Sequence, residues 1–152
     1  MTKQVTDPFV WKDEEYVFNG ADNVYSLFDP EALGLHPEAP TTACWKGFVI
    51  FFIVKDDRLF VDQLDVFCPD NAYPTINGVE AKAGGIMGMR RYEHLDMPCD
   101  YTGTIVISKN LKEGYEHRAF TGPHSYQTSF DLDFENGKLV SYRETTGNYS
   151  GF

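Results

Sequence analysis

The sequence predicts a mainly β domain: an antiparallel meander that curls into a small barrel or sandwich, with one or two short helical turns. Three observations support this fold class. Aromatic residues make up 15% of the 152 residues, and large flat side chains favour strands. Two segments carry strand-like apolar patterns that end in turn residues, as hairpins do. No stretch of ten or more residues shows the 3.6-residue apolar period of a helix.

The N-terminal part of the chain is expected to hold two short strands and one helical turn. The strands are predicted at 9–11 and 15–18, on either side of a charged turn. The segment 29–34 reads Asp-Pro-Glu-Ala-Leu-Gly, which supplies an N-cap, a proline at the first helical position and a terminating glycine. Residues 1–8 and 146–152 are polar or glycine-rich, and we expect both ends to be flexible.

A first hairpin is predicted around the most hydrophobic stretch. Residues 48–54 are apolar on both faces of an extended chain, so this strand is expected to be covered on both sides. Trp45 precedes it and is predicted to lie in the core. After a charged turn, 59–67 returns as a second strand. A two-residue loop would place Lys55 opposite Arg58, an unfavourable like-charge pair that a longer loop would avoid.

A second hairpin is predicted near the end of the chain. Residues 126–135 alternate apolar and polar side chains, which indicates a half-buried strand with one wet face. The following Asn136-Gly137 is a strong hairpin turn. A three-residue loop with a bulge at Gly137 would place Leu132 opposite Val140 and keep the two apolar faces together, so this register is predicted.

The stretch between the two hairpins is less regular. Residues 104–108 alternate and predict a strand, and 109–114 are polar and predict a turn. Residues 69–90 are rich in Gly and Pro, and their pattern places no element.

The whole-chain numbers indicate one soluble, acidic domain spanning 1–152. The formal net charge is −10, which disfavours binding to nucleic acid or to an anionic membrane. Cys44, Cys68 and Cys99 are odd in number, and no secretory leader opens the chain, so reduced thiols in a cytoplasmic protein are expected. The longest apolar run is too short to cross a bilayer.

Two stretches resemble a loose group of small uncharacterised bacterial β-rich proteins. One is 42–48, Thr-Ala-Cys-Trp-Lys-Gly-Phe, followed by a strand and the charged hairpin at 56–60. The other is 100–107, which contains a Thr-Gly strand, followed by the closing Asn-Gly hairpin at 126–140. The resemblance covers 42–140 and implies a shared fold and a bacterial origin. It implies no activity, because the group has none established.

A divalent metal site is one hypothesis for the histidines near the second hairpin. His117 and His124 flank a Gly-Pro turn, and Glu116 is adjacent to the first of them. Two imidazoles and a carboxylate are suitable metal ligands. The spacing matches no strong zinc motif, so the alternative is two loop histidines beside a turn, and no cofactor is assigned.

An anion site is a second hypothesis. Residues 84–89 contain Gly-Gly-x-x-Gly, and Arg90 and Arg91 follow directly. Arginines bind phosphate well, but the segment lacks the Gly-Lys-Ser/Thr of a phosphate loop and the strand–helix context. The alternative is a flexible loop that leads into a strand.

Two other groups of side chains were considered. Cys99 with His94 could form a nucleophile pair, but a cysteine in a short proline-containing loop usually packs in the core, so no catalytic residue is assigned. Asp131, Asp133 and Glu135 form an acidic strand face that could meet a basic partner. Such faces are more often solvated and discourage edge-to-edge aggregation.

These patterns favour a non-catalytic binding protein of the bacterial cytosol. One version is an immunity-type inhibitor, whose net charge of −10 would steer it onto a basic partner protein. The alternative is a small-ligand or metal-dependent binding protein or hydrolase, with a pocket in the barrel mouth lined by Tyr and Phe. A third possibility is a module that forms a homodimer through its sheet.

Overall fold

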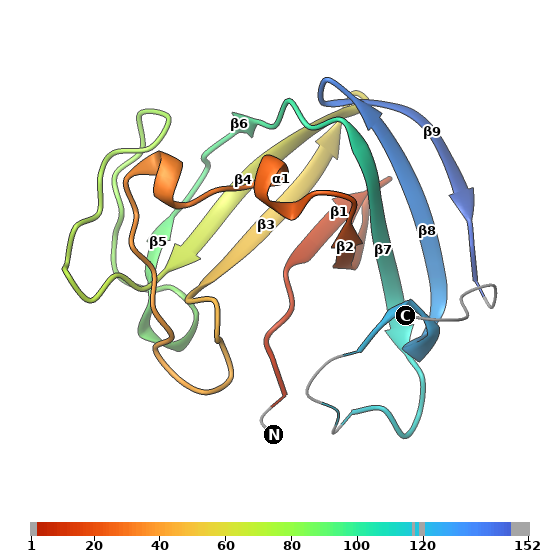
Figure 1. Cartoon of the computed structure of the whole chain (residues 1–152), viewed down its shortest axis with the longest axis horizontal. Helices are drawn as coiled ribbons and strands as arrows, with labels where there is room; N and C mark the ends of the chain where they lie inside the picture. Colours follow the sequence, from red (N-terminus) through yellow and green to blue (C-terminus); the bar gives the residue numbers. More distant parts are fainter. Residues whose placement is uncertain (1–2, 117, 119–120, 147–152) are drawn as a thin grey trace.

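The computed structural model describes residues 3–116, 118 and 121–146, and it confirms the mainly β fold class. The described residues form nine strands in a single mixed sheet, together with one short helix and three 3-10 turns (Figure 1). Seven of these strands close into a ring that is near to a barrel. The sequence had left barrel and sandwich open, and the ring decides between them.

The strands have from two to ten residues, and the helix and the 3-10 turns have three or four residues each. The strands are β1 (Pro8–Trp11), β2 (Glu14–Ala21), β3 (Phe48–Lys55), β4 (Arg58–Val66), β5 (Arg90–Tyr92), β6 (Met97–Pro98), β7 (Gly103–Leu111), β8 (Tyr126–Glu135) and β9 (Lys138–Glu144). The helix is α1 (Val24–Leu27), and the 3-10 turns are η1 (Glu31–Leu33), η2 (Ile86–Gly88) and η3 (Pro123–Ser125). No helix within the described residues has the length and apolar character needed to cross a membrane.

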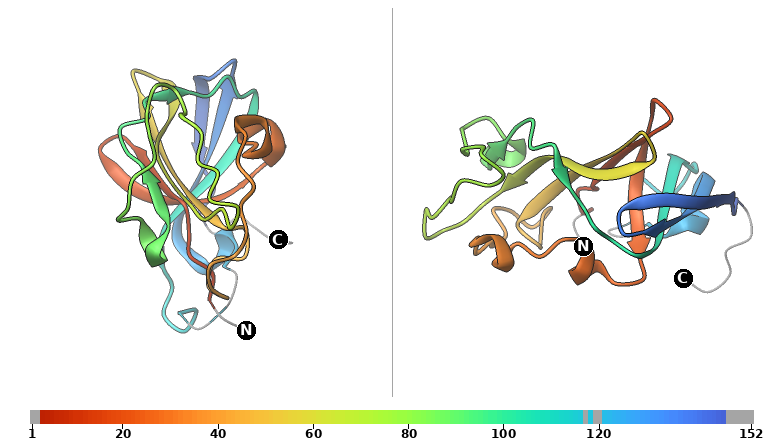
Figure 2. Two further views of the ribbon diagram at one scale, coloured as in Figure 1. Left: turned by 90° about the vertical axis from the view of Figure 1, so that its left-hand side faces the viewer. Right: turned by 90° about the horizontal axis from the view of Figure 1, so that it is seen from above.

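The ring runs in the order β3, β1, β2, β7, β8, β9, β4, and β4 pairs again with β3. Most pairs are antiparallel, as predicted, but β1 and β3 are parallel and share only two residue pairs, Phe9–Phe52 and Val10–Ile53. Parallel neighbours need a long crossover. The connection 12–47 provides it: it contains β2, and its second part, 22–47, carries α1 and η1 along one side of the molecule (Figures 1 and 2).

The ring closes between β4 and β9 at the tips of the two predicted hairpins. The two strands share one bridged residue pair. Two backbone hydrogen bonds flank it: Leu59 N–H donates to the Gly137 carbonyl at 2.9 Å, and Leu139 N–H donates to the Asp57 carbonyl at 2.7 Å. The turns are therefore part of the joint that closes the ring.

The first hairpin has the shorter of the two loops considered. Asp56 and Asp57 form a two-residue turn with φ of 51° and 61°, and Lys55 does lie opposite Arg58. The like-charge contact is relieved by a neighbouring carboxylate, because Lys55 Nζ lies 2.6 Å from Asp96 Oδ1. This hydrogen bond also raises the pKa of Lys55.

The predicted register of the second hairpin is wrong. Asn136 and Gly137 form a two-residue turn, with φ of 50° and 80°. A bulge is present, but it follows the turn and leaves Val140 without a cross-strand partner, so Leu132 lies opposite Tyr142. The requirement that apolar side chains share one face of the hairpin correctly predicted a bulge. It did not predict where the bulge lies, because the two-residue Asn-Gly turn matches the twist of the flanking strands and sets the loop length.

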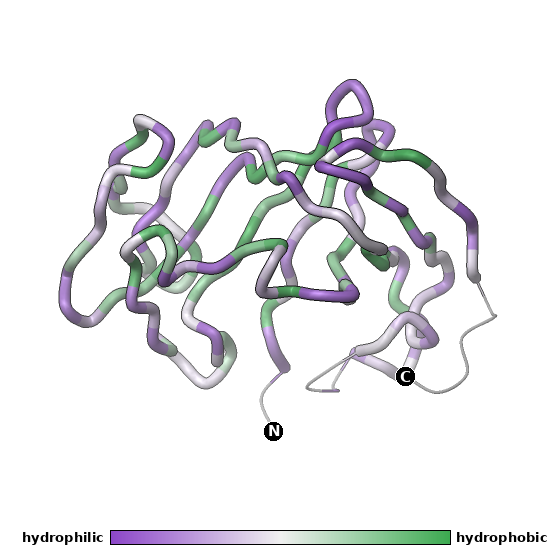
Figure 3. Tube along the Cα trace, turned by 45° about the horizontal axis from the view of Figure 1, so that its top comes forward, coloured by the Kyte–Doolittle hydropathy of each residue, from purple (hydrophilic) through white to green (hydrophobic). Residues whose placement is uncertain are grey.

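The core fills the inside of the ring. Hydrophobic residues lie along the strands, and β3 is hydrophobic on both faces, whereas several turns are hydrophilic (Figure 3). Val49 and Ile50 point to opposite faces and are both buried, which confirms that the start of β3 is covered on both sides. Trp11 is 3% exposed, but Trp45 is 48% exposed, so the prediction of a core Trp45 is wrong. Trp45 lies in the loop before β3, so its side chain does not follow the alternation of buried and exposed positions along that strand.

Two segments differ from expectation at their ends. Strand β7 continues to Leu111, past the predicted end at 108, because it pairs with β8 as far as Tyr126. At the N-terminus, part of the 1–8 segment that we expected to be flexible is anchored. Val5 N–H donates to the Ala43 carbonyl at 2.9 Å, and the Asp7 side chain is buried.

Candidate functional site

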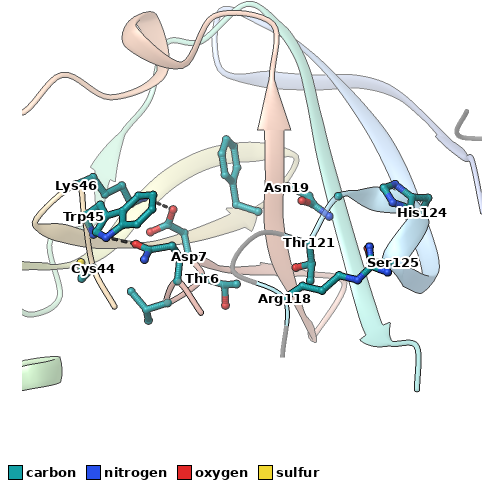
Figure 4. A pocket seen from close by; sticks show the side chains of 14 residues that line it. Thr6, Asp7, Asn19, Cys44, Trp45, Lys46, Arg118, Thr121, His124 and Ser125 are labelled. Carbon is teal, nitrogen blue, oxygen red and sulfur yellow. Dashed lines mark hydrogen bonds and ion pairs between the residues drawn. The ribbon is translucent and has the colours of Figure 1, made fainter. Parts of the chain in front are cut away.

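A cleft of about 720 Å³ opens between the N-terminal segment and the connection from β7 to β8 (Figure 4). Its volume is within the range of small-molecule sites. One wall is formed by Asp7 and the loop 44–46, and the other by Arg118 and His124. Asn19 of β2 lies beside the second wall (Figure 4).

Asp7 and Lys46 form an ion pair in the first wall. The Asp7 carboxylate is buried, and its other oxygen accepts a hydrogen bond from Ile50 N–H at 2.8 Å. Burying a carboxylate is unfavourable unless it is paired and hydrogen-bonded, and both conditions are met here. The Lys46 ammonium has three donors, so it keeps bonding capacity on the cleft side, where its side chain is 40% exposed.

Trp45 presents an exposed indole to the same cleft. Its backbone is fixed by Gln4, whose Oε1 accepts from Trp45 N–H at 2.9 Å while its Nε2 donates to the Thr42 carbonyl at 2.7 Å. Gly47 ends the loop at φ 81°, and a Cβ there would lie 2.5 Å from the Glu38 carbonyl oxygen. The Trp-Lys-Gly motif thus delivers two side chains to the cleft because only glycine fits after them.

The opposite wall is held by aromatic contacts. The Arg118 guanidinium lies 4.3 Å from the centroid of the Tyr115 ring, and the His124 ring packs edge-on against the same tyrosine at 6.4 Å. Thr121 Oγ1 lies 3.0 Å from the Tyr126 hydroxyl. These contacts place one guanidinium and one imidazole across the cleft from Lys46.

The cleft has a different charge from the chain as a whole. The full sequence has 13 Lys and Arg against 23 Asp and Glu. The cleft lining has Lys46 and Arg118 against Asp7 alone. Nothing in the local sequence pattern singled out Asp7 or Arg118, because neither belongs to a motif, whereas Trp45 and Lys46 were part of the noted 42–48 stretch.

The nearby thiol is not suited to nucleophilic chemistry. Cys44 lines the cleft but its side chain is buried, and this burial raises its pKa. A raised pKa keeps the thiol protonated at neutral pH, and the thiolate is the reactive form. Within 3–116, 118 and 121–146, no group of three or more His, Cys, Asp or Glu side chains is placed to hold a metal ion.

The residues of the predicted metal site fall in different places. His124 lines the cleft from η3. Glu116 is exposed, does not line the cleft, and its Oε2 accepts a hydrogen bond from Gly114 N–H at 3.0 Å. His117 lies outside the described residues. The described part of the predicted triad therefore places one imidazole in the cleft.

The predicted anion loop is occupied by a carboxylate of the protein itself. Arg91 Nε and Nη2 donate to the two oxygens of Asp65 at 2.8 and 2.9 Å, and Ile86 N–H donates to Asp65 Oδ2 at 2.9 Å. Asp65 is fully buried, and its hydrogen bond raises the pKa of Arg91. Arg90 is exposed and lies over the Tyr73 ring. The glycine-rich loop thus recognises an internal anion.

The predicted acidic partner face is partly neutralised. Arg143 on β9 donates to Asp131 at 2.8 Å and to Asp133 at 2.9 Å. The hydroxyls of Thr104 and Ser141 also donate to Asp133. These hydrogen bonds lower the pKa of Asp133, and that from Thr104 is the largest cause. Glu135 is exposed at the end of the strand. The predicted wet face is exposed at its two ends, whereas Ser129 is buried and the two central carboxylates are partly buried and bound to an arginine.

The Cys99 and His94 hypothesis finds no support in the geometry. Cys99 is 8% exposed, and burial raises its pKa to about 11. Its Sγ lies 3.9 Å from the Leu27 carbonyl, within the core. His94 is exposed in a turn. The thiol therefore packs as a small apolar side chain, as the sequence favoured.

No protein-family model, curated protein or solved structure matches the chain. The resemblance to small bacterial β-rich proteins therefore stays a prediction. The site must be interpreted from its own geometry.

The buried pair of Asp65 and Arg91 predicts a large stability effect. Asp65→Ala should lower the free energy of unfolding by about 3–5 kcal/mol, because it leaves a half-buried guanidinium and the Ile86 N–H without their acceptor. Asp96→Asn, which breaks the exposed pair with Lys55, should cost about 1 kcal/mol or less. Urea denaturation measures both, and equal effects would contradict the assignment.

The lowered pKa of Asp133 predicts a pH-dependent contribution to stability. Because the folded-state pKa lies below the unfolded value of about 3.9, the contribution is complete above about pH 4 and is lost as pH falls through the folded-state pKa. Asp133→Asn should therefore destabilise by roughly 0.5–1 kcal/mol at pH 7, since solvent screens this partly exposed group, and by less at pH 3. Urea denaturation at both pH values tests this, with Glu135→Gln as control.

Proposed function

We propose that the protein is a non-catalytic binding protein that holds a small anionic ligand in the cleft between Lys46 and Arg118. The observation that carries this proposal is a cleft lining with more positive than negative side chains, Lys46 and Arg118 against Asp7, in a chain whose net charge is −10. Positive groups that line a concave, low-dielectric wall focus the local field and attract anions. Arginine also binds carboxylate or phosphate through two parallel hydrogen bonds.

Trp45 supports a ligand that has a flat apolar part as well as a charge. Trp45 is 48% exposed and lies on the same wall as Lys46. An aromatic side chain of this kind provides a large contact area with little loss of conformational freedom. The proposed ligand is therefore a carboxylate or phosphate attached to a ring or short hydrocarbon.

A protein partner remains the second candidate, since the net charge of −10 favours a basic one. An immunity-type inhibitor is the concrete form of this candidate, and a homodimer through the sheet is another. Arg143 binds both Asp131 and Asp133, which leaves Glu135 as the exposed acid of the proposed face. We also propose the bacterial cytosol as its location, because the three cysteines are unpaired and buried.

The ligand proposal is tested by fluorescence titration with phenyl phosphate and with benzoate. Binding beside Trp45 should change the tryptophan emission, and Trp45→Phe should abolish the change. Arg118→Gln should weaken binding at least about tenfold, because a hydrogen bond to a charged group contributes about 1.5–3 kcal/mol. Lys112→Gln is the matched control, since Lys112 is exposed nearby and does not line the cleft.

Benzyl alcohol provides the neutral comparison. If it binds as tightly as benzoate, the cleft recognises the ring alone and the anion proposal fails. The proposal fails equally if neither anion binds, or if Arg118→Gln and Lys112→Gln weaken binding by the same factor. Circular dichroism of each variant confirms that the fold is retained.

A further inference from the structure

A second cavity, of about 570 Å³, lies between the α1–η1 segment and strands β2 and β3. It shares Asp7, Phe18 and Lys46 with the cleft, so the ion pair separates the two cavities. Its size suits a small organic molecule. Its lining differs in kind from that of the cleft.

The walls of this cavity are aromatic. Phe28 and Phe48 form a tilted pair with ring centroids 5.5 Å apart, and Phe18 and Phe52 form a second tilted pair at the same separation. Tyr25 stands at the rim and is 81% exposed. The faces of aromatic rings carry partial negative charge and attract cations within about 6 Å of the centroid.

The cavity already contains one cation–aromatic contact. Lys46 Nζ lies 4.8 Å from the centroid of the Phe48 ring, while Asp7 neutralises its charge. A protein ammonium therefore rests against the same kind of wall that a ligand ammonium would use. This contact shows that the Phe48 ring accepts a cation at its side of the cavity.

The polar groups at the rim favour positive charge. Asp29 and Glu31 line the cavity in addition to Asp7, and Lys46 is its one basic lining residue. Three carboxylates and one ammonium give a formal charge of −2. Asp29 Oδ1 accepts from Glu31 N–H at 3.1 Å, which fixes the first carboxylate at the start of η1.

We propose that this cavity binds a small organic cation, a quaternary ammonium or a protonated amine, between the phenylalanine rings and the two rim carboxylates. An aromatic enclosure recognises such cations because a ring face attracts the charge while the desolvated alkyl groups pack against it. The site is independent of the anion proposal, since it uses neither Arg118 nor Trp45. An anion would meet net negative charge here.

The test compares choline with 3,3-dimethyl-1-butanol, its neutral isostere, by isothermal titration calorimetry. Choline should bind at least tenfold more tightly than the alcohol. Phe28→Leu keeps an apolar side chain but removes a ring face, and should weaken choline binding severalfold. Phe67→Leu is the matched control, because Phe67 is also a partly buried phenylalanine but lies outside this cavity.

The rim carboxylates are tested separately by Asp29→Asn with Glu31→Gln. These surface changes keep the hydrogen-bonding shape and should also weaken choline binding, whereas Glu113→Gln should not. Equal binding of choline and the alcohol would show a purely hydrophobic cavity and overturn the proposal, as would no binding of choline or of tetramethylammonium. Arg118→Gln should leave choline binding unchanged, which separates this test from that of the anion cleft.

Discussion

The buried Asp7 carboxylate lies at the junction of the ring where two described strands, β1 and β3, run parallel. It lies directly before β1 and accepts hydrogen bonds from Ile50 N–H on β3 and from Lys46, while its backbone carbonyl accepts from Phe18 N–H on β2. The same residue therefore ties β1 to both of its neighbours. Because β1 and β3 share only two residue pairs, this polar contact adds to a junction that also contains the Phe9–Phe52 ring contact. A buried carboxylate without partners would be strongly unfavourable at this position, so Lys46 and Ile50 N–H must stay in place for Asp7 to remain buried.

The ion pair also explains why the molecule has two cavities with different chemistry. Asp7 and Lys46 lie in the linings of both cavities and separate them. On one side, the added side chains are Arg118 and Trp45, which suit an anion with a flat body. On the other side they are phenylalanines with carboxylates at the rim, which suit a cation.

The remainder of the ring depends on polar contacts that bridge segments far apart in the chain. The closing joint of β4 and β9 rests on backbone bonds between two turns. The glycine-rich loop near Arg91 is fixed to the sheet by buried Asp65, and Arg143 holds the two carboxylates of the β8 face. Arg91 resembles an anion-binding group in the sequence, but in the folded protein both it and Arg143 neutralise carboxylates of the protein itself. Arg118 of the cleft lies instead against the Tyr115 ring.

The sequence by itself determined the fold class, the two central hairpins and the wet face of β8, because alternation and turn residues act over a few neighbouring positions. It could not place the bulge at Val140, because the local sequence around Asn136 and Gly137 is compatible with both a two-residue and a three-residue loop. It also misjudged Trp45, whose exposure depends on a loop fixed by Gln4. Only the tertiary structure decided which charged groups are engaged. Asp65 and Arg91 are 26 residues apart and Asp7 and Lys46 are 39 apart, and such pairings form when distant segments pack.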